Sequence, residues 1–139
     1  TFDRSIDDKG RLILPASFRE ALGENEAVVT RGLDRCVVLM PSDHFQRWQE
    51  KIEGLPMTSG QARNLKRHVY SGAAPANPDG QGRISIPSFL RVYANLQGAV
   101  MVCGVGSYVE IWNVQQWADL RERIETSGDD EAAWDALGI

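Results

Sequence analysis

The chain has 139 residues, of which 42% are hydrophobic and 24% are charged, and its formal net charge at pH 7 is −4. This composition is typical of a globular protein and excludes an intrinsically disordered chain. No apolar run approaches the about 18 residues of a membrane span, and no basic leader precedes an apolar segment, so we expect a cytoplasmic protein with no membrane partner.

The first third of the chain predicts a strand, a helix and a hairpin, in that order. The short strand lies at residues 11–14, directly after a Gly-Arg pair. Pro15 suits the first turn of the helix, and Gly23 suits its end. The apolar runs at residues 27–30 and 36–40 are joined through a glycine-containing turn, which is typical of a hairpin.

Two helices are predicted next, at residues 42–52 and 59–70, and Ser42 is the expected N-cap of the first. A loop rich in Gly, Pro and Asn follows at residues 71–82. Beyond this loop, from Arg83 onward, the pattern of strand, helix and hairpin occurs a second time.

The C-terminal region predicts an amphipathic helix over residues 113–124, with Asn113 as its N-cap. The apolar stripe of this helix consists of Val114, Trp117, Leu120 and Ile124. Acidic side chains outnumber basic ones by five in residues 119–139, so the remainder of the chain carries a net charge of +1. We expect the last dozen residues to be mobile.

The two strand-helix-hairpin units are copies of one sequence. Residues 7–15, DDKGRLILP, return at residues 79–87 as DGQGRISIP, an offset of 72 positions. The same offset without a gap pairs Ala27 with Ala99, Val28 with Val100 and Gly32 with Gly104. A duplicated supersecondary unit is therefore predicted. Because two copies are too few for a solenoid, we expect them to pack about a pseudo-two-fold axis and to share one core.

The repeated turn Asp-x-x-Gly-Arg is the candidate functional site, at residues 7–11 (the first turn) and 79–83 (the second turn). The glycine suits a positive φ angle, and the aspartate suits hydrogen bonds from the backbone amides of the turn. A turn does not require the arginine, whose guanidinium, steadied by the aspartate, suits a phosphate or a guanine edge. The alternative is a surface ion pair of little consequence.

The candidate ligand-facing residues are Arg11 and Arg83, and Lys9 adds a positive charge to the first turn. Gln81 stands in the second turn where the first has Lys9, so the two turns need not contribute equally. Arg4 and Arg19 neighbour the first turn and are candidates for electrostatic steering.

Residues 7–19 and 79–91 resemble the two signature blocks of the MraZ family, and each block alone is similar to those of AbrB and SpoVT-type regulators. The resemblance covers nearly the whole chain. By motif position it implies that the DNA-binding residues are Asp7, Gly10, Arg11, Asp79, Gly82 and Arg83, with Lys9 beside them. It implies a mostly β fold with helices (α+β), in which two tandem repeats form a swapped-hairpin, double-split β-barrel. It also implies a closed ring of subunits in the cytoplasm and nucleoid, which binds direct repeats in double-stranded promoter DNA and represses its own cell-division and cell-wall operon.

The chain divides into four expected segments. They are a first repeat at 1–48, a helical linker and loop at 49–76, a second repeat at 77–120, and a helix end with an acidic tail at 121–139.

Two other classes of function stay open. The chain could be an assembly module that does not bind DNA, or an antitoxin-like partner protein of the same fold. An enzyme would use Asp7 and Asp79 as paired carboxylates, but the sequence offers no nucleophile or oxyanion device beside them. His44 and His68 lack the spacing of metal ligands. We therefore predict no enzymatic activity, no cofactor, no metal site and no small-molecule substrate.

Overall fold

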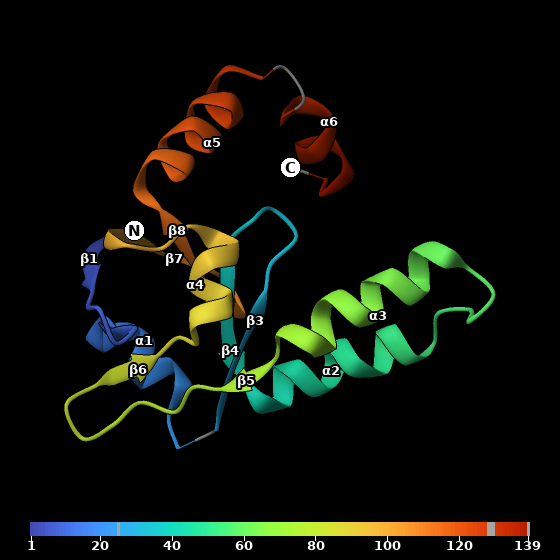
Figure 1. Ribbon diagram of the computed structural model, residues 1–139. Helices are drawn as coiled ribbons and strands as arrows, with labels where there is room; N and C mark the ends of the chain where they lie inside the picture. Colours follow the sequence, from blue (N-terminus) through green and yellow to red (C-terminus); the bar gives the residue numbers. More distant parts are fainter. Residues whose placement is uncertain (25, 128–129, 139) are drawn as a thin grey trace.

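The computed structural model describes residues 1–24, 26–127 and 130–138. Within them, eight strands form one antiparallel sheet that curls into a half-barrel, and six helices accompany it (Figure 1). The first half of the chain contains β1 (Phe2–Ile6), β2 (Arg11–Ile13), α1 (Ala16–Leu22), β3 (Ala27–Arg31), β4 (Val37–Pro41), α2 (Ser42–Glu53) and α3 (Gly60–Gly72). The second half contains β5 (Ala74–Pro75), β6 (Arg83–Ser85), α4 (Ser88–Ala94), β7 (Gly98–Val105), β8 (Tyr108–Asn113), α5 (Val114–Thr126) and α6 (Asp130–Ala136).

The sheet has the strand order β5-β3-β4-β8-β7-β1-β2-β6, and it joins the two repeats at β2–β6, at β4–β8 and where β1 pairs with β7. In the β2–β6 ladder Leu12 lies opposite Ile84, and in the β4–β8 ladder Val38 lies opposite Glu110. In both pairs each residue faces its own counterpart at an offset of 72. The predicted pseudo-two-fold axis is therefore confirmed, and it runs through both ladders.

The offset does not hold without a gap, and this part of the prediction was wrong. Val29 on β3 pairs with Leu39, whereas Val102 on β7 pairs with Ile111, the counterpart of Leu39. Val29 therefore corresponds to Val102, at an offset of 73. Burial agrees with this offset, because Ala27 and Val100, which it pairs, are both at most 1% exposed. If β7 kept the offset of 72, its apolar side chains would point to the opposite face of the sheet from those of β3. An extra residue before β7 keeps them on the same face.

A hydrophobic cluster on the concave side of the sheet is shared by the two repeats, as predicted. Leu12 and Leu14 from the first repeat pack with Ile84, Ile86 and Leu90 from the second, and all five are at most 1% exposed. A second cluster joins β3, β4, β7 and β8 to α2 and α3, which project together as a helical hairpin (Figure 1). The second cluster includes Cys36 and Cys103, both buried free thiols.

Several helix boundaries differ from the prediction. Pro15 precedes α1 rather than lying in its first turn, while Gly23 ends α1 with a φ of +59° as expected. Ser42 is the first residue of α2 rather than its N-cap, a position that Pro41 occupies, and the N–H of Ser42 donates to the carbonyl of Glu26 at 2.7 Å. Asn113 does cap α5, by accepting a hydrogen bond from the N–H of Gln116 at 3.0 Å.

The C-terminal segment, which was expected to be mobile, contains the short helix α6 at Asp130–Ala136. Residues 128, 129 and 139 of that segment lie outside the described residues. The apolar stripe predicted for α5 contains no buried residue, and Ile124 is 50% exposed. Within the part of the chain that the structure describes, no helix is long and apolar enough to cross a membrane.

Candidate nucleic-acid interface

The first turn is a compact connection between β1 and β2. The N–H of Asp7 donates to the carbonyl of Arg11 at 3.0 Å, and the N–H of Gly10 donates to the carbonyl of Asp7 at 3.0 Å. Gly10 has a φ of +82°, a conformation that other L-residues rarely adopt. The Asp7 carboxylate accepts two backbone amides through Oδ1, from Lys9 at 3.0 Å and from Arg11 at 2.8 Å. The aspartate and the glycine therefore have the structural roles that the sequence predicts.

The guanidinium of Arg11 is held at one edge only. Its Nε donates to Oδ2 of Asp7 at 2.8 Å, and neither of its Nη groups has a hydrogen-bond partner among the described residues. The backbone amide of Arg11, then its side chain and the amide of Lys9, lower the pKa of Asp7 against the opposing effect of desolvation. The aspartate thus stays ionised and fixes the plane of the guanidinium, while the Nη groups stay without a hydrogen-bond partner among the described residues.

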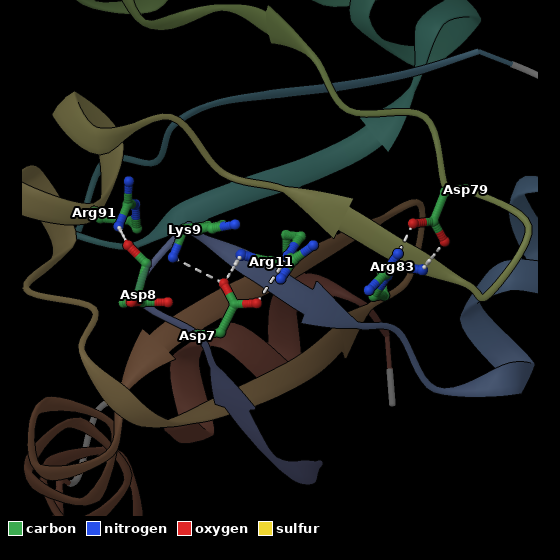
Figure 2. Close-up of polar contacts among 7 residues, drawn as sticks. All are labelled: Asp7, Asp8, Lys9, Arg11, Asp79, Arg83 and Arg91. Carbon is green, nitrogen blue, oxygen red and sulfur yellow. Dashed lines mark hydrogen bonds and ion pairs between the residues drawn. The ribbon is translucent and has the colours of Figure 1, made fainter.

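The second turn repeats this geometry closely (Figure 2). Oδ1 of Asp79 accepts the amides of Gln81 at 2.8 Å and Arg83 at 2.9 Å, and Oδ2 accepts Nε of Arg83 at 2.9 Å. Gly82 has a φ of +77°. The amide of Arg83 is the largest cause of a lowered pKa at Asp79. The two turns, 72 residues apart, therefore hold their arginines in the same way: Nε is bonded to the aspartate, and the Nη groups have no partner among the described residues.

The turns lie at opposite ends of one two-stranded ribbon, because β2 and β6 run antiparallel and each begins at its turn. The carbonyl of Gly10 accepts the N–H of Ile86 at 2.8 Å, and the carbonyl of Gly82 accepts the N–H of Leu14 at 3.0 Å. Each turn is thereby anchored to the strand of the other repeat, and the ribbon fixes the two arginines relative to one another.

Two further arginines support the turns, and sequence reasoning missed their role. Nε of Arg91 donates to the carbonyl of Ile86 at 3.1 Å, and its Nη1 lies 3.4 Å from the carbonyl of Asp8 in the first turn. Arg19, the counterpart of Arg91, packs against Gly82. Arg19 thus contacts the second turn rather than the first, and the arginines are exchanged between repeats. The sequence did offer one signal for this role, since Arg19 and Arg91 are matched by the repeat offset of 72.

Several other basic side chains lie outside this ribbon. Lys9 is exposed at the tip of the first turn, and Arg4 donates to the neighbouring carbonyl of Asp3. On α3, Lys66 pairs with Glu53 at 3.6 Å and the other basic side chains bond locally. Among the described residues no group of three or more His, Cys, Asp or Glu side chains could hold a metal ion.

Comparison with known proteins decides the family. The model of the family described as "MraZ protein, putative antitoxin-like" matches this chain twice, at residues 1–68 and 69–137. This chain belongs to the MraZ family. The first turn of this MraZ chain lies in the first matched half, and the second turn lies in the second matched half.

Full-length relatives agree with this assignment. A protein of Natranaerobius thermophilus named "Transcriptional regulator MraZ" is 46% identical, over 91% of this chain and 87% of the relative. A protein of the same name from Thermomicrobium roseum is 45% identical, over 91% of this chain and 89% of its own length. Another, from Halothermothrix orenii, is 41% identical over 99% of this chain and 96% of its own length.

Proposed function

We propose that this MraZ protein is a transcriptional regulator that binds double-stranded DNA through its two turns. The observation that carries the proposal is the state of Arg11 and Arg83: each is held through Nε by an ionised aspartate, and each has two Nη groups without a partner among the described residues. A guanidinium presented in this way matches the oxygens of a phosphate or the O6 and N7 acceptors of guanine. The names of the relatives, which are regulators rather than enzymes, support the same function.

The proposed regulator works as a closed ring of identical subunits on direct repeats of its own promoter. The formal net charge of one chain is −4, so a single protomer has little electrostatic attraction to DNA. A ring presents many turns at once and makes later contacts intramolecular, which raises the avidity by about 10²-fold to 10⁴-fold when the turns match the spacing of the repeats. In this proposal the protein acts in the nucleoid as a repressor of its own operon.

The test replaces the two arginines and measures binding to the promoter upstream of the protein's own gene at several salt concentrations. Arg11→Ala and Arg83→Ala should each weaken specific binding by about 5-fold to 150-fold, the range for loss of one bidentate base contact. Circular dichroism and native mass should stay unchanged. Arg67→Ala is the matched control, because among the described residues the Arg67 side chain bonds to Asn64 alone, within α3, and its loss removes the same charge.

Two results would overturn the proposal. Normal promoter binding by both single variants and by the double variant would remove the turns from the interface. Indifference of the wild-type protein to DNA, even at low salt, would favour the assembly module or the antitoxin-like partner.

A further inference from the structure

The outer face of the β2–β6 ribbon carries more than the two arginines. Leu12 and Ile84 point into the core and are each 1% exposed. Because successive side chains of a strand alternate between faces, the residues on either side of them project outward. These outward residues are Arg11 opposite Ser85, and Ile13 opposite Arg83.

Ile13 is the unusual member of this set. It is 51% exposed and belongs to neither hydrophobic cluster. Strand geometry places its Cα within about 7 Å of the Cα of Arg83 across the ladder and of Arg11 along the strand. A single exposed isoleucine is common on protein surfaces, but this one stands between two arginines whose Nη donors are available. Its counterpart in the second repeat is Ser85, so the pseudo-two-fold is broken here.

The chemistry of this face fits one groove of DNA. The major groove is about 12 Å wide and admits a two-stranded β-ribbon, and its floor displays the guanine acceptors together with the 5-methyl group of thymine. Arginines suit the former, and an exposed aliphatic side chain between them suits the latter. The minor groove offers no methyl group, and a phosphate oxygen gives an isoleucine nothing to contact.

On the basis of the proposed DNA binding, we propose that the outer face of the β2–β6 ribbon enters the major groove and that Ile13 packs on the methyl group of a thymine. Ser85 presents a hydroxyl at the equivalent place and does not make this contact. Lys9 and Gln81 differ between the turns in the same way. Each protomer therefore reads an asymmetric sequence, although its backbone is nearly two-fold symmetric, and repeated sites for such a reader are direct rather than palindromic.

The experiment uses the full-length protein, its own promoter duplex, and duplexes in which single thymines are replaced by deoxyuridine, which lacks only the methyl group. Wild-type affinity should fall by about fourfold at one thymine of the site, the factor for burying one methyl group. Ile13→Ser gives the ribbon face the same residue at both places, and this variant should bind the thymine and deoxyuridine duplexes equally. Ile124→Ser is the matched control, since Ile124 is 50% exposed on α5, and it should keep the wild-type preference.

Three results would overturn the inference alone. The wild-type protein could bind its promoter with the same affinity whichever thymine is replaced. The Ile13→Ser variant could keep the wild-type preference for thymine, or its oligomeric mass under native conditions could change. The last would make Ile13 a contact between copies of the chain. Absence of specific DNA binding by the wild-type protein would overturn the proposed function itself, and the inference with it.

Discussion

Replacing the glycines of the turns by alanine should produce three different effects on stability. Gly82 has a φ of +77°, and an added Cβ would fall on the flexible Arg19 side chain, which can move. The expected cost of Gly82→Ala is therefore that of the backbone conformation, about 1–2 kcal/mol. At Gly10, with a φ of +82°, the Cβ would lie 2.5 Å from the carbonyl oxygen of Ile86. Backbone must then shift and the Ile86–Gly10 ladder bond weakens, so Gly10→Ala should cost about 2–3 kcal/mol.

Gly80→Ala is the control in the same loop. A Cβ at Gly80 meets nothing within 4 Å, and its φ is not positive. Alanine there reduces the freedom of the unfolded chain and should stabilise the protein by about 0.4–1 kcal/mol. The assay is denaturant and thermal unfolding followed by circular dichroism, with a Tm change of about 3–5 °C per kcal/mol. Equal stability of Gly82→Ala and Gly80→Ala, or a Gly10→Ala variant no less stable than Gly82→Ala, would refute this reasoning.

Two further predictions concern charge. Removing residues 127–139 deletes four acidic and no basic side chains, which raises the formal net charge from −4 to 0. Promoter binding in a gel shift should therefore be unchanged or tighter, and markedly weaker binding would contradict this prediction. Because the pKa values of Asp7 and Asp79 are lowered by folding, their stabilising contribution is complete above the unfolded value of 3.8 and is lost as the pH falls through the lower folded values. Wild type should therefore lose its stability advantage over the Asp7→Asn and Asp79→Asn double variant on acidification, and an advantage that does not shrink as the pH falls below 3.8 would argue against the assignment.

The repeated unit could be predicted because its signals are local. Alternation of Ile84 and Ile86 around a polar residue indicates a strand, and Pro15 and Gly23 bound a helix within one residue. The roles of Asp7 and Gly10 follow from turn chemistry and are confirmed as geometry, while contact with DNA stays a prediction.

The features that could not be predicted depend on the other repeat. β1 is a strand although Asp3 and Arg4 interrupt its apolar pattern, because β7 supplies its backbone partners. The extra residue before β7 was hidden, since the valine-rich runs of the two repeats match equally well at an offset of 72 or 73. The exchange of Arg19 and Arg91 between the turns arises only when β2 and β6 meet.

The pairing of Leu12 with Ile84 also affects the order in which the parts of the chain fold. The two paired residues are 72 positions apart, about half of the chain, and closing such a loop is slow compared with forming a local helix. A ribosome must release the whole second strand before the ribbon can form. The nascent first repeat therefore holds an arginine turn with no partner strand, and a chain truncated before β6 should lack the ribbon on which the proposed DNA binding depends.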